Sequence, residues 1–341
     1  MAISKARVHK GWLAGLPMLL ALGQGCAAAL EIEAVTDHPS FAPFIQEMVD
    51  RHGFDANQLT ELFANARMHP GIIKAISHPA EAKPWYQYRR IFLTPGRIDG
   101  GIAYWNRHSK ILAAAKERYG VDPRVIVAII GVETSYGRND GSYRILDSLS
   151  TLAFGYPPRA QFFRGELEQF LLLSREEQVD PLTVTGSYAG AMGQGQFIPS
   201  SYRRYAVDFD EDGKRDLWDS PSDIIGSIAN YLHKHGWEPG QLVVSPVRIH
   251  GVRYRTLLRQ GLKPHISLAK IRQYGVDPLL SLPNQRLAML VELETPKGSE
   301  YWLGLNNFYV ITRYNHSALY AMAVHQLSEE IEKQREIVNN L

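Results

Sequence analysis

The stretch AIIGVETSYGRNDG, residues 128–141, places one carboxylate at the end of an apolar run. The run begins at Val125, and seven of its eight residues are apolar before Glu133 follows. Asp122 and Pro123 precede it as a helix N-cap and a first-turn residue, so we expect a helix here. A glutamate is rarely buried without a partner, and a buried carboxyl group holds its proton more tightly.

Two interpretations of Glu133 follow from this spacing. Isoleucines three, four and seven residues earlier share its face of the helix, so burial is expected to raise its pKa. A raised pKa suits a general acid that works near neutral pH. In the alternative interpretation, Glu133 caps the helix end or pairs with Arg138 or Arg144. The spacing alone leaves both open.

The composition describes a nearly neutral chain that is long enough for a substantial core. It has 341 residues, of which 45% are apolar, which fits one large domain or two to three smaller ones. Lys and Arg total 37 against 35 Asp and Glu; without the three basic residues of the first 29, the balance is 34 against 35. No basic field is available for nucleic acid, which we exclude as a partner.

Residues 1–29 are expected to be an export signal, because basic residues precede an apolar segment too short to span a bilayer. One processing route cuts after Ala29. In the other, Cys26, the only cysteine, carries the lipid of a bacterial lipoprotein, although Gly23 fits that signal poorly. We favour a soluble product exported to the periplasm, with membrane attachment only if Cys26 is lipidated.

Hydrophobic periodicity divides the rest of the chain into helical and strand-like parts. Helices are expected within 41–76 and over 101–119, 122–137, 142–154, 160–178, 220–232, 267–275 and 318–336. Strand-like segments are 242–249, 287–294 and 308–314. The expected domains are a helical part (30–100), a catalytic core (101–240), a small β-containing insertion (241–310) and a C-terminal return to the helical region (311–341).

The segment DFDEDGKRDLWD, residues 208–219, has the spacing of an EF-hand calcium loop. The expected ligands are Asp208, Asp210, Asp212, the Lys214 carbonyl, Asp216 and Asp219. Gly213 stands where the loop must turn sharply, and Asp219 replaces the usual glutamate, which should weaken or reshape coordination. The carboxylates would repel one another without a cation, so we expect one structural Ca²⁺ rather than an acidic surface turn.

Longer motifs carry a resemblance to a known family. GVETSYGRNDGSYRILDSLSTLAF (131–154), GSYAGAMGQGQFIPSSYRRYAVDFDEDG (186–213) and ITRYNHS (311–317) resemble the B-type lytic murein transglycosylases. These bacterial enzymes cut the glycan strands of peptidoglycan. The similarity extends from about residue 45 to the C-terminal helix. It implies a mainly α (α+β) fold, with a lysozyme-like helical core, a surrounding helical domain and a small inserted β domain.

The resemblance also implies a mechanism. Glu133 would be the lone catalytic acid and base, protonating the glycosidic oxygen between N-acetylmuramic acid and N-acetylglucosamine. It would then deprotonate the muramoyl 6-hydroxyl, which closes a 1,6-anhydro ring without water. Hydrolytic glycosidases usually need a second carboxylate for the water, and an intramolecular hydroxyl removes that need. Asp147, the nearest downstream acid in a helix, is interpreted as structural.

A sugar cleft is implied by residues that match the family motifs: Tyr88, Arg159, Ser187, Met192, Gly193, Gln196, Tyr231, Tyr314 and Asn315. Glycine lets backbone approach a sugar, and amide groups bind acetamido and hydroxyl groups. Any one of the tyrosines could instead be plain core. Pro158 stands where the family often has a first of two arginines, so contacts to a stem-peptide carboxylate or the lactyl group are expected to be weaker.

Three functions remain as hypotheses. The first is the non-hydrolytic lyase. The second is a muramidase that hydrolyses the same bond, which would need a second carboxylate that the sequence does not identify. The third is a peptidoglycan-binding protein without turnover. Expected partners are peptidoglycan strands and other cell-wall enzymes, with no organic cofactor and a monomeric chain.

Overall fold

The structure is a computed structural model that describes residues 34–77 and 83–339. The expected export signal, with Cys26 and Ala29, lies outside the described residues. Within the described part of the chain, no helix combines the length and the apolar character needed to cross a membrane.

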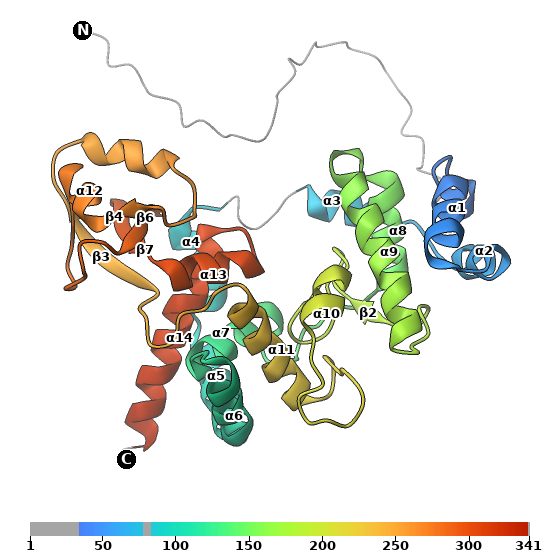
Figure 1. The fold of residues 1–341 in the computed structure, drawn as a ribbon, viewed down its shortest axis with the longest axis horizontal. Coiled ribbons are helices and arrows are strands. Elements are labelled where there is room, and N and C mark those ends of the chain that lie inside the picture. The colour runs from blue at the N-terminus through green and yellow to red at the C-terminus, as the bar shows by residue number, and fades with distance from the viewer. Residues whose placement is uncertain (1–33, 78–82, 340–341) are drawn as a thin grey trace, which may run out of the picture. The chain divides into compact units, whose positions relative to one another are not determined.

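Helix α7 (Pro123–Thr134) lies at the centre of the helical part. Asp122 accepts a hydrogen bond from the backbone nitrogen of Arg124 at 3.1 Å, which confirms the predicted N-cap. Every residue from Val125 to Val132 is buried, as expected for a helix that is apolar on all sides. The helices that pack around it are α5 (Pro95–Arg107), α6 (Ser109–Tyr119), α11 (Pro221–Lys234) and α14 (Ala318–Asn339) (Figure 1).

Two further groups of helices precede α5 or follow α7. The first group is η1 (Val35–Asp37), α1 (Phe41–His52), α2 (Ala56–Ala64), α3 (Pro70–Ile76) and α4 (Trp85–Phe92). The second is α8 (Ile145–Gly155), η3 (Pro157–Arg159), α9 (Ala160–Glu176) and α10 (Pro199–Tyr205). Helix α9 packs against both α8 and α10. The predicted helix over 142–154 begins three residues late, because Tyr143–Arg144 form strand β1, which pairs with β2 (Thr185–Gly186).

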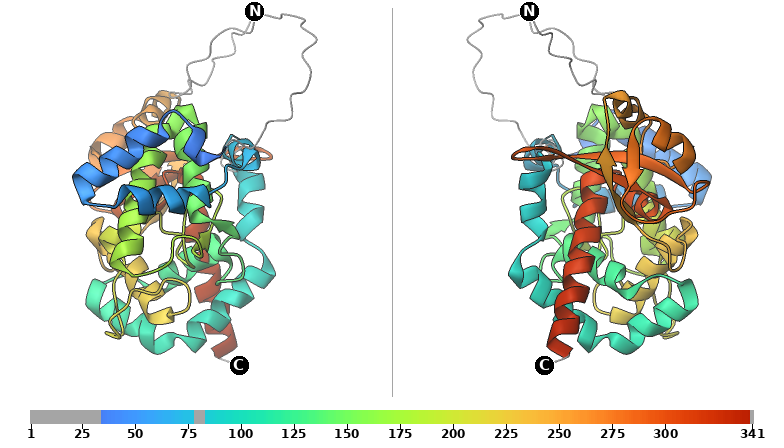
Figure 2. Two further views of the ribbon diagram at one scale, coloured as in Figure 1. Left: turned by 90° about the vertical axis from the view of Figure 1, so that its right-hand side faces the viewer. Right: turned by 90° about the vertical axis from the view of Figure 1, so that its left-hand side faces the viewer.

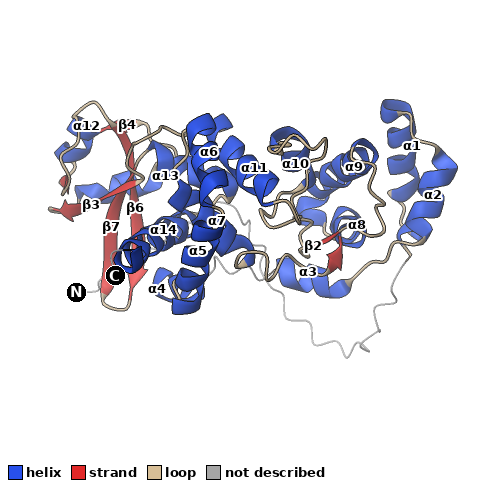
Figure 3. Ribbon diagram, turned by 90° about the horizontal axis from the view of Figure 1, so that it is seen from below, coloured by secondary structure: helices blue, strands red, loops and turns tan. Residues whose placement is uncertain are grey.

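A five-stranded antiparallel sheet has the strand order β4-β6-β7-β3-β5. Its strands are β3 (Val244–Ile249), β4 (Ile266–Ser267), β5 (Val276–Pro278), β6 (Leu287–Thr295) and β7 (Gly298–Gly304). Helices η4 (Arg253–Arg259) and α12 (Leu268–Gln273) accompany them. Figure 3 shows the strands gathered together, with α12 beside them.

Strand β6 is buried on both faces, which explains its nearly continuous apolar sequence. Ala288 and Leu290 belong to a small separate core inside the β part. Met289, Val291 and Leu293 belong to the large core of the helical part. Because successive side chains of a strand point to opposite faces, β6 joins the two cores. Figure 2 shows α14 running away from the sheet to the C-terminal end.

One predicted strand is wrong. Residues 308–314 form most of helix α13 (Asn306–Tyr314). Phe308, Val310 and Ile311 are fully buried there, and burial against the helical core outweighs the weak strand propensity of Val, Ile and Thr. The mainly α fold with a small sheet is confirmed. The domain boundaries drawn from the sequence stay a prediction.

Candidate active site and metal loop

The end of α7 fixes the position of Glu133. Ser135 and Tyr136 follow the helix with φ angles of 53° and 64°, a left-handed conformation that is unusual for two consecutive residues with side chains. The Tyr136 hydroxyl donates to the carbonyl of Arg97 at 2.8 Å. Gly131 leaves room for this ring, because a Cβ atom there would lie 2.5 Å from the Tyr136 hydroxyl oxygen.

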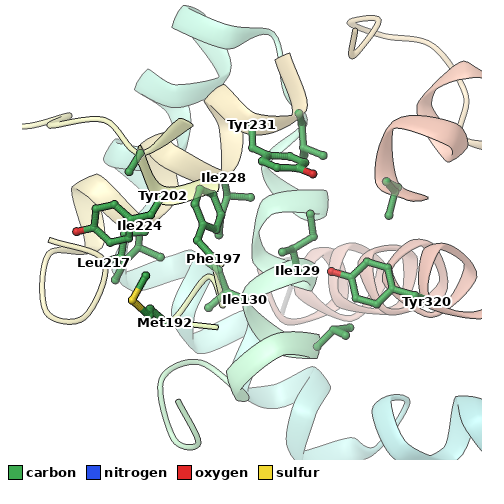
Figure 4. Packing of buried hydrophobic residues seen from close by; sticks show 14 of the residues in the cluster. Ile129, Ile130, Met192, Phe197, Tyr202, Leu217, Ile224, Ile228, Tyr231 and Tyr320 are labelled. Atoms are coloured by element: carbon green, nitrogen blue, oxygen red, sulfur yellow. The ribbon is translucent and has the colours of Figure 1, made fainter. Parts of the chain in front are cut away.

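Glu133 is half-buried rather than buried, because it lies in the last turn of α7. Its Oε1 accepts a hydrogen bond from the Tyr320 hydroxyl at 2.5 Å. Burial, followed by the Glu133 charge, raises the pKa of Tyr320 and of Tyr314 well above the ordinary tyrosine value. Both phenols therefore keep their protons at neutral pH. Figure 4 shows the Tyr320 hydroxyl directed from α14 toward the part of α7 that carries Ile129.

The arginines considered as structural partners of Glu133 contact other groups. Arg144 donates to Asp147 with an Nε–Oδ2 distance of 2.8 Å. Asp147 is buried and also accepts from the backbone nitrogen of Arg67 at 3.0 Å. The Nε of Arg138 donates to the carbonyl of Ser135 at 3.0 Å. The contacts of Asp147 with Arg144 and Arg67 support the interpretation of Asp147 as structural.

A cavity of about 820 Å³, which we call the large cavity, has Tyr314 in its wall. Five of the predicted sugar-binding residues line it: Arg159, Gln196, Tyr231, Tyr314 and Asn315. The rings of Tyr314 and Tyr320 are nearly parallel, at 7°, with centroids 6.4 Å apart. Tyr314 thus connects the cavity wall to the tyrosine that binds Glu133.

The hydroxyl groups of two wall tyrosines bind backbone carbonyls. Tyr314 donates to Gly195 and Tyr231 donates to Arg313, each at 2.5 Å. Gln196 has a positive φ of 50° and donates through Nε2 to the carbonyl of Asp140 at 2.9 Å. These bonds hold the glycine-rich loop and the start of the 311–317 motif in fixed positions.

Four predicted sugar-binding residues do not line the large cavity. Met192 is fully buried, and Gly193 has a φ of 66° and packs against the backbone of Leu217. Ser187 Oγ accepts from the backbone nitrogen of Ala191 at 3.0 Å within the same loop. Tyr88 is buried on α4, where its ring contacts Phe92 and Trp85. In this structure these residues shape the loop and the core behind the cavity.

The described residues that line the large cavity include positive side chains and no negative ones. Its lining includes Arg159, Arg204 and Arg313, whereas the described residues of the lining include no Asp or Glu. Burial lowers the pKa of His235 and of His316, so both are neutral near pH 7. The arginines therefore make this cavity positive.

Sequence reasoning missed three residues of this site. Arg204 and Arg313 lie inside the quoted motifs, so the motifs themselves were the available signal. Tyr320 lies only five residues after Asn315, but no local pattern distinguishes it from a core tyrosine.

Arg159, the arginine that follows Pro158, packs over an aromatic ring of the same lining. Its guanidinium carbon lies 4.4 Å from the ring centroid of Phe162.

The 208–219 loop gathers three carboxylates. Oxygen atoms of Asp208, Asp210 and Asp212 lie within 4.8 Å of one another, a donor set that suits a hard cation such as Ca²⁺. Asp216 is not part of this cluster, and its Oδ1 accepts from the backbone nitrogens of Trp218 and Asp219 at 2.8 and 2.9 Å. The fit to Ca²⁺ therefore rests on the first half of the loop.

A buried carboxylate outside the loop holds its two arms together. Asp223 accepts from the backbone nitrogens of Phe209 at 2.7 Å and Asp216 at 2.8 Å. Burial raises the pKa of Asp223. The backbone nitrogen of Asp223 donates to Ser220 Oγ at 3.3 Å, which confirms Ser220 as the predicted cap of α11.

The mainly helical fold and an acid at the end of a buried central helix are typical of one class, the lysozyme-like enzymes that cleave glycans. A family model described as "Transglycosylase SLT domain" matches residues 36–329. The chain therefore belongs to this family, and it is an enzyme of the lytic transglycosylase class.

Curated and solved relatives agree with this assignment. The membrane-bound lytic murein transglycosylase B of Escherichia coli K12 is 46% identical over 305 residues, which cover 86% of this chain and 83% of the relative. The soluble lytic transglycosylase SltB1 of Pseudomonas aeruginosa is 51% identical, with a TM-score of 0.82, over 87% of this chain and 100% of the other.

Two further solved structures contain ligands. Escherichia coli Slt35 in complex with calcium is 45% identical, with a TM-score of 0.80, and the match covers 88% of this chain and 94% of the other. Pseudomonas aeruginosa SltB3 in complex with NAG-anhNAM-pentapeptide is 36% identical, with a TM-score of 0.75, over 85% of this chain and 78% of the other.

Proposed function

We propose that Glu133 is the single general acid and base with which this lytic transglycosylase cleaves peptidoglycan. The observation that carries this proposal is its position at the end of α7, bound to Tyr320, whose ring faces Tyr314 in the wall of the large cavity. Glu133 would protonate the glycosidic oxygen that leaves. It would then accept the proton of the muramoyl 6-hydroxyl as that oxygen attacks C1, so the product ends in 1,6-anhydromuramic acid.

The surroundings of Asp147 favour this route over hydrolysis. A hydrolytic glycosidase needs a second carboxylate to activate water or to act as a nucleophile. Asp147, the nearest downstream acid in a helix, is buried and bound by Arg144 and by the backbone nitrogen of Arg67. An internal hydroxyl reacts without one, because it is held close to the reacting carbon. The anhydro sugar bound by the relative SltB3 agrees with this chemistry.

Two further roles belong to this proposal. The arginines of the large cavity would bind the carboxylates of stem peptides or the lactyl group of the muramoyl sugar. Gln196 and Asn315 would bind sugar acetamido and hydroxyl groups through their amides. The positive lining would offset the loss of one arginine at Pro158 in this chain.

Mass analysis of the products from purified peptidoglycan tests the reaction. The expected muropeptides are one water lighter than reducing ones. Reducing ends would instead establish hydrolysis, with a second catalytic group still to be identified. Absence of any product from folded, calcium-loaded protein would favour a binding protein without turnover.

The variant Glu133→Gln tests the acid. It keeps the shape of the side chain but cannot transfer the proton, so we expect kcat to fall by about a thousandfold or more. Glu117→Gln is the matched control, because Glu117 is an exposed glutamate on α6. Near-normal turnover by Glu133→Gln would overturn the assignment.

We also propose that the 208–219 loop binds one structural Ca²⁺, held by Asp208, Asp210 and Asp212 with help from the Lys214 carbonyl, Asp216 and Asp219. A ligand that binds only the folded state stabilises it by about 2.7 kcal/mol at one hundred times its Kd. Thermal unfolding in Ca²⁺ and in EGTA should therefore differ for the wild type. The difference should shrink in Asp210→Asn and persist in Asp99→Asn, an exposed control on α5. Identical unfolding in Ca²⁺ and EGTA would rule the site out.

The proposed location is the periplasm. One relative is described as membrane-bound and another as soluble, so we keep both processing routes for the N-terminus. The mass of the mature N-terminal peptide separates them, because cleavage after Ala29 gives an unmodified Leu30 terminus and lipidation adds acyl chains at Cys26.

A further inference from the structure

The residue after Glu133 is a buried threonine whose hydroxyl joins two segments of the chain. Thr134 is 1% exposed. Its Oγ1 accepts a hydrogen bond from the backbone nitrogen of Gly137 at 3.0 Å. The same atom lies 3.1 Å from the carbonyl oxygen of Gln194 and donates to it, with the Ile130 carbonyl at 3.3 Å as a second acceptor. The Thr134 hydroxyl therefore ties the end of α7 to the glycine-rich loop.

Gln194 is held from its other side by the 208–219 loop. Its backbone nitrogen donates to the carbonyl of Leu217 at 2.8 Å, and its Nε2 donates to the carbonyl of Trp218 at 2.8 Å. Its side chain also packs against Gly137, where a Cβ atom would lie 2.8 Å from the Gln194 Cδ atom. Gln194 thus contacts both the 208–219 loop and the turn that follows α7.

The two carbonyls that hold Gln194 belong to the second arm of the 208–219 loop. Asp223 joins this arm to the first, because its carboxylate accepts from the backbone nitrogens of Phe209 and Asp216. The carboxylates of the first arm repel one another, and a cation bound between them would remove that repulsion and draw the loop together. The bound cation would therefore help to fix Gln194 through those two carbonyls.

The turn that follows Glu133 depends on support from outside it. Ser135 and Tyr136, with their left-handed φ angles, lie between the two ends of the Thr134–Gly137 hydrogen bond. Strained backbone of this kind persists only where its surroundings hold it in place. A displacement of about 1 Å at a reacting group can lower a rate by about a hundredfold. The anchors of this turn therefore matter for the acid beside it.

We propose that Thr134 and Gln194 are positioning residues that couple the 208–219 loop to Glu133. The loop fixes Gln194 when a cation holds its arms together, Gln194 accepts from the Thr134 hydroxyl, and Thr134 fixes the backbone from which the Glu133 side chain extends. This coupling rests on the proposed roles of Glu133 as the acid and of the loop as a calcium site. Hydrogen exchange tests the coupling without turnover, whereas Glu133→Gln and the unfolding curves in EGTA test those roles, so the failures are distinguishable.

The first measurement compares kcat and KM on one soluble glycan substrate. Thr134→Val keeps the shape of the side chain and removes its hydroxyl, so we expect kcat to fall about tenfold to hundredfold with KM nearly unchanged. Thr134→Ser keeps the hydroxyl and should retain kcat within about threefold of the wild type.

Thr151→Val is the matched control for the loss of a buried hydroxyl. Thr151 is also 1% exposed, and its Oγ1 likewise accepts from a backbone nitrogen, that of His69, and donates to a carbonyl, that of Asp147. It lies on α8, so its loss should lower stability and leave kcat near that of the wild type.

The second measurement is hydrogen exchange of single backbone amides, followed by NMR on ¹⁵N-labelled protein in Ca²⁺ and in EGTA. The reporters are the amide of Gln194, which bonds the Leu217 carbonyl, and the amide of Ser135, which bonds the Gly131 carbonyl at 3.1 Å. In the wild type, Ca²⁺ should slow the exchange of both amides about tenfold or more. In Thr134→Val, the Gln194 amide should still respond to Ca²⁺ and the Ser135 amide should not.

The Leu305 amide, which bonds the Val243 carbonyl in the β part at 3.0 Å, is the control for a change in global stability and should respond less. Any of four outcomes would overturn the proposal. They are equal kcat in folded Thr134→Val and Thr151→Val, equal loss of kcat in the valine and serine variants of Thr134, no effect of Ca²⁺ on Ser135 exchange, or an equal effect on Leu305. Exchange of the wild-type protein decides the question even where Thr134→Val fails to fold.

Discussion

The two cavities of this molecule differ in the charges of the residues that line them. The large cavity has arginines without acids, and the hydroxyls of its wall tyrosines Tyr231 and Tyr314 bind backbone carbonyls. A second cavity of about 440 Å³, which we call the junction cavity, is lined by residues of α4, α7, β7 and α14, and its arginines are matched by glutamates. The lining of the first is positive and suits an anionic polymer, whereas the lining of the second has no net charge.

This comparison teaches that volume does not reveal the role of a cavity. Charge balance and the state of its hydrogen bonds are more informative, because desolvated charges and unpartnered polar groups are what a ligand must match. Three predictions test whether the two cavities differ in this way.

The largest expected effect concerns the junction cavity. Burial and the nearby Arg124 charge lower the pKa of His325 to about 4, although Glu329 lies 3.9 Å away. An unfolded histidine titrates near 6.5, so this stabilising contribution is complete above pH 6.5 and is lost as the pH falls toward 4. The free energy of unfolding should fall in that window by up to about 3 kcal/mol more for the wild type than for His325→Gln.

Denaturant unfolding at pH 7, 6, 5 and 4 measures this difference. Other histidines titrate equally in both proteins, so only the difference between the two curves counts. Parallel curves would mean that His325 is as solvated as an ordinary surface histidine, and the contrast between the cavities would weaken.

The second prediction concerns the tyrosine beside the acid. Tyr320→Phe removes the hydroxyl that donates to Glu133 and keeps the ring that faces Tyr314. A hydrogen bond to a charged group contributes about 1.5–3 kcal/mol, so we expect kcat to fall about tenfold to hundredfold with little change in KM. Steady-state kinetics on one soluble glycan substrate measure both. A rise in KM alone would indicate that Tyr320 binds sugar instead of positioning Glu133.

The smallest expected effect concerns the charge of the large cavity. Arg204 is exposed and lines it, with its guanidinium over the ring of Tyr205. Arg204→Gln should raise KM about threefold for peptide-bearing glycans, because an exposed charge contributes less than about 1 kcal/mol. Arg259→Gln, an exposed arginine outside both linings, is the control. Equal effects on glycans with and without peptides would contradict the assignment to carboxylates.

The sequence by itself determined the features that depend on local pattern. The Asp122 cap, the all-round apolar character of α7 and the Ser220 cap of α11 could be predicted, because caps and periodicity act within a few residues. The spacing of Asp208, Asp210 and Asp212 likewise predicted the carboxylate cluster that the structure contains. The quoted motifs also predicted the family and the fold.

Only the tertiary structure decided which distant residues meet. Residues 308–314 are strand-like alone, and packing against the helical core makes them a helix. Tyr320 binds Glu133 although 187 positions separate them, and the junction cavity joins segments from Arg89 to Glu330. Local patterns constrain backbone dihedrals and the faces of elements, whereas such contacts depend on how whole elements pack, which no short stretch of sequence encodes.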